Sequence, residues 1–331
     1  MSSPVRAILT MLVLAGGMKT RTLAQQSVDT TSELPAPPGR LIDVGGRRMH
    51  LLCRGVGSPT VVLEAGASSF AIDWTLVQRE VSNTNRTCSY DRAGMGWSEP
   101  AAPGTRTSTA VDLHTLLEKA GERGPYVLVG ASRGGMLVRS YLAEYPDDVI
   151  GFVFVDPSTE DRLFTMIDGQ AMAIAEVTAE QLRSTFPKEA VRVPRRQPQT
   201  GVPFDKLPPD LYQLRLRLDE RLIAAMPDTV SAAIVANSQE SERAFLARLL
   251  ATRKEQFPLG SRPTVVLTRG DEPNEGRASS HAALARLSSN SRHSIVAGSG
   301  HEIHLFEPPA VITAIADVVR AIREKSVLPP R

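Results

Sequence analysis

A single serine stands among three glycines near the middle of the chain, and this short stretch limits the fold more than any other. Residues 126–129 are four apolar residues in a row, which is typical of a buried strand, and residues 136–143 have the pattern of a helix. Between them Gly130, Gly134 and Gly135 surround Ser132. A serine on so tight a turn needs neighbours that are almost free of side chains. The stretch predicts a strand–turn–helix unit that lifts a hydroxyl to the end of a sheet.

The hydroxyl of Ser132 is a candidate nucleophile. A free serine hydroxyl reacts poorly at neutral pH and needs an adjacent base. His301 follows the last predicted strand in a Gly-Ser-Gly-His loop and is the first candidate for that base, with His304 as its rival. The alternative is a glycine-rich turn with an incidental serine, and a loop histidine without a role in chemistry.

Strands and helices alternate along most of the chain. Two short strands flank Gly45 and Gly46, which predicts a hairpin. Further strands are expected at 60–64, 87–91, 149–155, 263–268 and 294–298, and helices at 74–81, 108–120, 281–287 and 309–322. Such alternation predicts an α/β fold with a mainly parallel sheet and an antiparallel edge. Ligands of these sheets bind beyond the carboxyl ends of the strands, so the four residues that follow strands there should converge: Ser132, Asp156, Asp271 and His301.

Residues 158–261 interrupt this alternation. Helical periodicity with many prolines dominates there, and candidate helices are 179–185, 210–225 and 229–252. We therefore expect residues 40–157 and 262–325 to form one α/β core, with 158–261 inserted as a helical cap.

The first 39 residues differ from the rest. Arg6 precedes an apolar run over 7–18 and a small-residue site near residue 24, which is typical of a secretory signal peptide. That run is too short to span a bilayer. We expect residues 1–24 to direct the protein to a secreted or periplasmic location, or else to be a disordered tail of a cytoplasmic protein. Residues 25–39 are polar and proline-rich, as in a linker.

Composition excludes several kinds of partner. The formal net charge of the 331 residues is +2, so nucleic-acid binding is not expected, and no other stretch is long and apolar enough for a membrane span. Neither of the two cysteines has the spacing of a metal ligand, and no cofactor or metal is expected. Nothing in the sequence predicts an oligomeric state.

Several motifs together resemble the α/β-hydrolase fold family, in its serine hydrolase and esterase branch with a helical cap. The resemblance covers about residues 40–325 and implies a mainly parallel eight-stranded sheet flanked by helices, with the cap inserted after strand six. Five stretches carry it, in the family's order: 63–67, 89–98, 130–135, 154–157 and 298–301.

The resemblance also implies roles for individual residues. Ser132 would be the nucleophile and His301 the base. The acid that orients the histidine stays open: Asp156 at the end of strand six is favoured, Asp271 is the runner-up, and Glu272 comes third. As alternatives, Asp156 caps the first turn of the cap and Asp271 is a turn residue. The backbone N–H groups of Ala67 and Arg133 would form the oxyanion hole.

The implied activity is hydrolysis of a small to medium hydrophobic carboxylic ester, which makes such an ester the expected small-molecule partner. Amide, thioester or C–C bond hydrolysis with the same residues is an alternative, as is a ligand-binding receptor with little turnover. The segments 91–92 and 97–98 are assigned to loop packing. In the family's sheet order strand two lies beside strand four, so Cys53 and Cys88 form either a disulfide or two buried free thiols.

Overall fold

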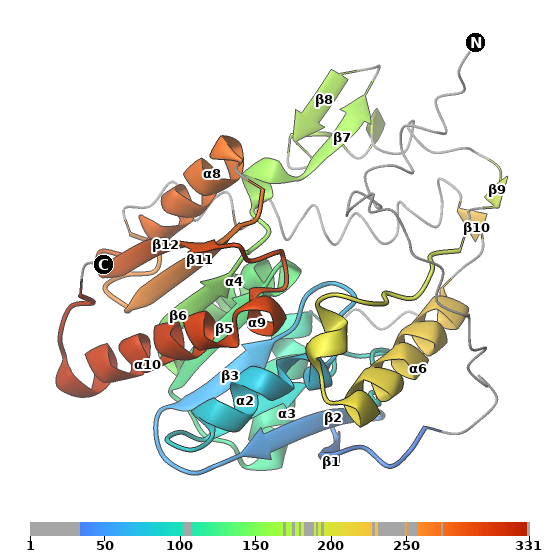
Figure 1. Cartoon of the computed structure of the whole chain (residues 1–331), viewed down its shortest axis with the longest axis horizontal. Coiled ribbons are helices and arrows are strands. Elements are labelled where there is room, and N and C mark those ends of the chain that lie inside the picture. The colour runs from blue at the N-terminus through green and yellow to red at the C-terminus, as the bar shows by residue number, and fades with distance from the viewer. Residues whose placement is uncertain are drawn as a thin grey trace.

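An eight-stranded sheet forms the centre of the computed structural model (Figure 1). The structure describes residues 34–329, apart from 102–107, 168–169, 174–175, 179, 182–188, 190, 193–194, 227–228, 231–248, 250–256 and 273. The predicted signal peptide therefore lies outside the described residues, as does most of the predicted linker. Among the described residues, no helix combines the length and the apolar character that crossing a bilayer requires.

The strand order confirms the predicted α/β architecture. It is β1-β2-β4-β3-β5-β6-β11-β12, and all neighbours from β4 onward run parallel. The first two strands form the predicted hairpin, and β2 pairs antiparallel with β4. The strands are β1 (Arg40–Asp43), β2 (Arg48–Arg54), β3 (Thr60–Glu64), β4 (Thr87–Tyr90), β5 (Tyr126–Ala131), β6 (Val149–Val155), β11 (Thr264–Gly270) and β12 (Ser291–Ala297).

Helices cover both faces of the sheet, because the central strands are apolar on both sides. Val61 and Val127 face one layer, whereas Val62 and Leu128 face the other, as the two-residue period of a strand requires. The first layer contains α2 (Thr75–Val81) and α10 (Pro308–Glu324); the second contains α3 (Thr109–Ala120), α4 (Arg133–Glu144) and α8 (Glu275–Ala285). In Figure 1, α2 and α10 lie in front of the sheet.

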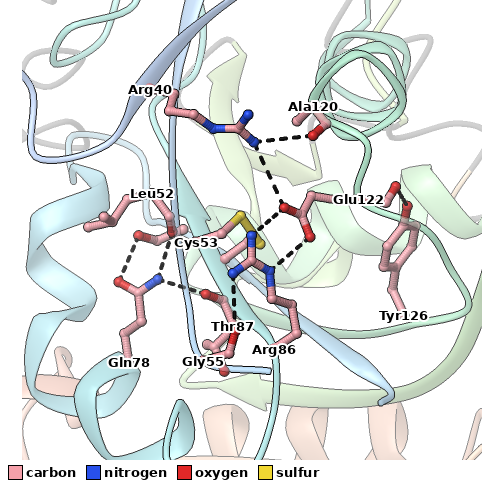
Figure 2. The surroundings of a disulfide bond; sticks show 12 residues. Arg40, Leu52, Cys53, Gly55, Gln78, Arg86, Thr87, Ala120, Glu122 and Tyr126 are labelled. Carbon is pink, nitrogen blue, oxygen red and sulfur yellow. Dashed lines mark hydrogen bonds and ion pairs between the residues drawn. A yellow bond between two sulfur atoms is a disulfide. The ribbon is translucent and has the colours of Figure 1, made fainter. Parts of the chain in front are cut away.

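Cys53 and Cys88 form a disulfide, so of the two alternatives left open by the sequence the structure has the bridge. The cysteines are direct partners in the β2–β4 register, with Cα atoms 4.0 Å apart. Figure 2 shows the bridge beside Glu122, whose carboxylate accepts hydrogen bonds from Arg86 at 2.6 and 3.0 Å. Within the described residues, Cys53, Cys88 and Glu122 form the one cluster close enough to hold a metal, and both of its sulfur atoms are already bonded to each other.

The insertion follows β6, as predicted, but its described part is not purely helical. Helix α6 (Pro209–Ala225) confirms the helix expected at 210–225. Two short antiparallel pairs were not expected: β7 (Phe164–Ile167) with β8 (Gln170–Ala173), and β9 (Val191–Arg192) with β10 (Thr229–Val230). The sequence holds a signal for the first pair, since an Asp-Gly dipeptide at 168–169 is typical of a hairpin turn. Most of the predicted helices 179–185 and 229–252 lie outside the described residues.

A buried ion pair joins the insertion to the core. Arg215 of α6 donates from Nε to Asp73 Oδ1 at 3.0 Å, and both side chains are almost fully buried. Asp73 belongs to η1 (Ala71–Trp74), the turn that precedes α2. The Arg215 guanidinium also lies 3.5 Å from the centre of the Phe204 ring and donates to Gln199. Burial raises the pKa of Asp73 to about 6, although the charge of Arg215 opposes this rise.

We expect Arg215→Met to lower the free energy of unfolding by about 3–5 kcal/mol, because it leaves the Asp73 carboxylate buried without its cation. Denaturant unfolding at neutral pH measures the loss. The double variant Arg215→Met/Asp73→Asn should lose less than the single one, since no unpaired charge remains. Arg48→Met, which breaks an exposed ion pair with Glu99, is the control and should change stability little. Equal losses in Arg215→Met and Arg48→Met would contradict this account.

Candidate active site

Ser132 stands at the sharp turn between β5 and α4. Its backbone has φ 51° and ψ −123°, a conformation that residues other than glycine rarely adopt. A methyl group added at Gly130 would lie 2.5 Å from the carbonyl oxygen of Gly134, and one added at Gly134 would lie 2.5 Å from that of Glu64. Backbone segments thus crowd the serine, and the expected requirement for side-chain-free neighbours is confirmed.

Asp156 directly follows β6, the neighbour of β5. The Ser132 N–H donates to the carbonyl of Val155 at 3.0 Å, so the two strand ends are hydrogen-bonded at the serine. Asp156 also has a positive φ of 38°, which turns the chain away from the sheet. Its carboxylate is 4% exposed and accepts from the backbone N–H of Arg269 at 3.1 Å.

His301 lies in the loop between β12 and α9 (Ile303–Phe306). Its Nδ1 is 2.6 Å from Asp156 Oδ2. Because a carboxylate only accepts, Nδ1 carries the proton and Nε2 is left with a lone pair. The imidazole is 38% exposed, so solvent and a small ligand can reach it. The structure therefore pairs His301 with Asp156, which follows the strand next to the one that ends at Ser132.

Each member of the Asp156–His301 pair favours the charged form of the other. Burial alone lowers the pKa of His301, but the hydrogen bond to Asp156 and the charges of Glu302 and Asp156 outweigh it, so the pKa lies above 6.5. Burial raises the pKa of Asp156, but the hydrogen bond and charge of His301 and the N–H of Arg269 outweigh it and hold this pKa below 3.8. Asp156 thus stays ionised near neutral pH.

The other two candidate acids are not beside the histidine. Asp271 is 37% exposed, accepts from the backbone N–H of Glu272 at 2.9 Å and lies 3.6 Å from Arg269 Nε. Glu272 is 74% exposed and pairs with Arg269 Nη2 at 3.2 Å. Within the described part of the chain neither carboxylate contacts His301. The sequence could not separate these acids, because position after a strand does not give the direction of a side chain.

His304, the rival base, is buried in the α9 turn. It is 3% exposed, and its ring lies against that of Trp74 with centroids 4.5 Å apart. Burial, with the charges of His301 and Arg215, lowers the pKa of His304 to about 3. The ring is therefore neutral near pH 7 and shielded from solvent, which fits packing better than proton transfer.

The two residues expected to supply the oxyanion hole follow β5 and β3, which are neighbours in the sheet. Arg133 begins α4 immediately after it, so its N–H belongs to the helix N-terminus, where negative charge is favoured. Ala67 lies in the loop after β3, next to Gly66, and a methyl group added at Gly66 would lie 3.4 Å from Cβ of Ser132. Arg133 therefore directly follows Ser132, and the residue before Ala67 borders it, while the oxyanion-hole role of both N–H groups stays a prediction.

The loop after β4 contains a buried hydrogen-bond network around Asp91. Its carboxylate accepts from the backbone N–H of Ala71 at 2.8 Å and bonds His50 Nδ1 at 2.7 Å. Ser98 accepts from the His50 N–H and donates to the Asp91 carbonyl at 2.6 Å. These contacts fit the loop packing assigned to Asp91 and Ser98. The adjacent Arg92 has a different position, on the loop that contains Ala67.

A buried histidine behind Asp156 has no counterpart in the sequence analysis. His281 of α8 lies 4.0 Å from Asp156 Oδ1 and hydrogen-bonds the Pro157 carbonyl at 2.8 Å and the Thr268 hydroxyl at 2.7 Å. Burial lowers the pKa of His281 to about 4, so it is neutral near pH 7. Its Nε2 must donate to the carbonyl, and Nδ1 accepts from Thr268. No sequence signal marks this residue, because the contact joins α8 to a turn 124 positions earlier.

Sequence and structure comparisons place this chain among proteins with the same fold. The sequence profile of the family described as alpha/beta hydrolase fold matches residues 59–308. The chain is 36% identical over 107 residues to an AB hydrolase superfamily protein of Gibberella zeae, covering 31% of this chain and 33% of that protein. It is 35% identical over 137 residues to the lipase LipV of Mycobacterium tuberculosis, covering 40% of this chain and 46% of that protein. The chain thus spans less than half the length of these curated relatives, and only 18% of another.

Solved structures extend the likeness to most of the chain. A putative lipase of Acinetobacter baumannii has a TM-score of 0.57 at 15% identity, covering 87% of this chain and 92% of the other. A meta-cleavage product hydrolase of Pseudomonas fluorescens has a TM-score of 0.58 at 16% identity, covering 87% and 98%. At these identities the likeness establishes the fold only. The family profile, by contrast, matches residues 59–308, which is more than half of the chain. The chain therefore belongs to the alpha/beta hydrolase fold family.

Proposed function

We propose that this protein is a serine hydrolase that cleaves small to medium hydrophobic carboxylic esters through an acyl-enzyme intermediate. The observation that carries the proposal is the 2.6 Å contact between His301 Nδ1 and Asp156, at the edge of the sheet where Ser132 stands on its strained turn. This contact leaves His301 Nε2 free to accept a proton.

In the proposed reaction Ser132 Oγ attacks the ester carbonyl carbon, and its proton passes to His301 Nε2. The N–H groups of Ala67 and Arg133 stabilise the negative charge that develops on the carbonyl oxygen. The tetrahedral intermediate collapses, and His301 returns the proton to the departing alcohol. Water then attacks the acyl-enzyme by the same steps, which releases the acid and restores Ser132. Asp156 orients His301 and stabilises its protonated form throughout.

Labelling with a fluorophosphonate tests the proposal directly. We expect the purified protein to bind one equivalent of the probe, with the modified peptide containing Ser132, and to release p-nitrophenol in a burst from a short-chain p-nitrophenyl ester. Tight binding of a hydrophobic ligand without labelling would instead indicate a receptor. A panel of esters, anilides, thioesters and vinylogous diketones compares the bond types that the same residues can cleave. Faster turnover of any class other than the esters would contradict the ester assignment.

The pH dependence of turnover follows from the pKa of His301. Only the neutral imidazole accepts a proton, and its pKa lies above 6.5, so kcat/KM should rise with pH through a midpoint above that value. In Asp156→Asn, His301 keeps its partial burial, which lowers its pKa, but it loses the negative charge of Asp156, which raises its pKa. The midpoint of the residual activity should therefore move to lower pH. Profiles of kcat/KM from about pH 5 to about pH 9 measure both midpoints, and an unchanged midpoint in the variant would contradict the pairing.

The disulfide supports a location outside the reducing cytosol, since such bridges persist in oxidising compartments. We therefore propose that the protein works as a secreted or periplasmic enzyme. A reporter enzyme active only after export, fused behind residues 1–33, should be active; a reporter retained in the cytosol would contradict this location.

A further inference from the structure

The side chain of Arg92 contacts the loop that would form half of the oxyanion hole. Its Nη1 donates to the carbonyl of Ala65 at 2.7 Å, and its Nη2 donates to the carbonyls of Gly66 and Ala67 at 2.5 and 3.1 Å. One guanidinium thus binds three consecutive carbonyl groups. Its planar, rigid set of donors makes such a contact possible, and lysine could not reproduce it.

A buried acidic residue holds the guanidinium in place. Glu64, the last residue of β3, is 1% exposed and accepts from Arg92 Nη1 at 2.6 Å. The hydroxyl of Tyr90, at the end of β4, donates to the other oxygen of the same carboxylate. Burial raises the pKa of Glu64, and the Arg92 charge and the Tyr90 hydrogen bond oppose this rise. Arg92 is therefore anchored to the ends of two neighbouring strands.

Because the peptide bond is planar, the position of the Gly66 carbonyl also fixes the direction of the Ala67 N–H. The peptide that joins Gly66 to Ala67 is not among the cis peptides of the described residues, so its C=O and N–H point in opposite directions. Holding the Gly66 carbonyl on Arg92 therefore directs the Ala67 N–H to the other side of the loop. Gly66 itself borders Ser132, since a methyl group added at Gly66 would lie 3.4 Å from the Cβ of Ser132. A cation on the carbonyl also polarises the peptide and makes its N–H a stronger donor.

We propose that Arg92 is a positioning residue for the oxyanion hole, which fixes and polarises the Gly66–Ala67 peptide toward Ser132. This inference rests on the proposed serine hydrolase function. The sequence of residues 91–92 predicts only loop packing for Arg92, and its contacts with residues 65–67 add an effect on the reaction. Arg92 acts only through the backbone and does not touch the substrate.

The test compares Arg92→Met and Arg92→Lys with Arg292→Met. Arg292 is another arginine with little exposed surface, paired with Asp317 at 2.7 Å between β12 and α10, and among the described residues it has no hydrogen bond or ion pair with residues 64–67. We expect Arg92→Met to lower kcat by about tenfold to a hundredfold with KM nearly unchanged, because the loss falls on the transition state. Arg92→Lys should lie between this variant and the wild type, and Arg292→Met should match the wild type in kcat.

A second readout separates positioning from a general loss of structure. A boronic acid forms a tetrahedral adduct on serine, whereas the carboxylic acid product binds without one. In Arg92→Met the affinity for the boronic acid should fall by the same factor as kcat/KM, while the affinity for the product stays constant. Added guanidinium ion should restore part of the kcat of Arg92→Met and leave the kcat of Arg292→Met unchanged. Parallel loss of both affinities, or equal kcat in Arg92→Met and wild type, would overturn the proposal.

Arg92→Met leaves Glu64 buried without its cation, so the single variant is accompanied by Glu64→Gln/Arg92→Met, which removes both charges. If the single variant does not fold, the double variant carries the same kinetic test. The two proposals fail separately. A Ser132→Ala variant that stays active would reject the serine hydrolase, whereas its inactivity combined with a normal Arg92→Met would reject only the positioning role.

Discussion

Replacing Ser132 by alanine should lower kcat for a p-nitrophenyl ester roughly 10⁶-fold, to the level that binding and the oxyanion donors alone supply. The loss is this large because no other group in the proposed reaction can attack the carbonyl carbon. Stopped-flow release of p-nitrophenol and long steady-state assays together cover the range.

The fold should survive this change, which makes the result interpretable. Ser132 holds a strained positive φ, and alanine has almost the same backbone preference, so the melting temperature should stay close to that of the wild type. Ser68, two residues before Phe70 on the neighbouring loop, is the matched control: Ser68→Ala should keep nearly full activity. A Ser132→Ala protein that still hydrolyses the ester at a tenth of the wild-type rate or more would exclude this serine as the nucleophile.

Asp156→Asn should lower kcat roughly 10⁴-fold. An asparagine amide donates to Nδ1 and so stabilises the tautomer whose Nε2 carries a proton, which leaves Ser132 without a base. The change removes charge but little volume, and the Arg269 N–H can still donate to the amide oxygen, so the turn should keep its shape.

Asp271→Asn is the matched control for this change, because it makes the same substitution at the other acid that the sequence left open. Asp271 is partly exposed and bonded to its own neighbour, so its kcat should stay within about twofold of the wild type. The opposite order of the two variants, with Asp271→Asn the inactive one, would mean that the loop rearranges when substrate binds and that Asp271 is the orienting acid.

Local patterns predicted the sheet and the serine turn because the physical causes are themselves local. Side chains alternate along any strand, and a serine on a tight turn requires glycines beside it. Both requirements come from the local backbone and do not depend on the rest of the fold. The β7–β8 hairpin was missed although an Asp-Gly signal was present, because proline and helical periodicity dominated the interpretation of the insertion.

The orienting acid and Arg92 could not be obtained in that way. Asp156 and Asp271 both follow strands, so their positions in the sequence do not distinguish them. Which carboxylate contacts His301 depends on the backbone conformation at Asp156, where φ is positive, and on the path of the loop that contains His301. Arg92 binds backbone carbonyls about 25 positions earlier. Every residue has a backbone carbonyl, so no residue type in the sequence marks these partners. Contacts of this kind depend on how the strands are placed next to one another, which requires the fold.

The bridge between Cys53 and Cys88 has one more consequence. It encloses the whole stretch from the end of β2 to β4, including the loop with Gly66 and Ala67, within a single covalent ring. A protease that cuts this ring once leaves two fragments that stay attached to each other until a reductant is added. If the protein is exported as proposed, a single protease cut in the loop with Gly66 and Ala67 leaves the strands on either side of the cut covalently joined.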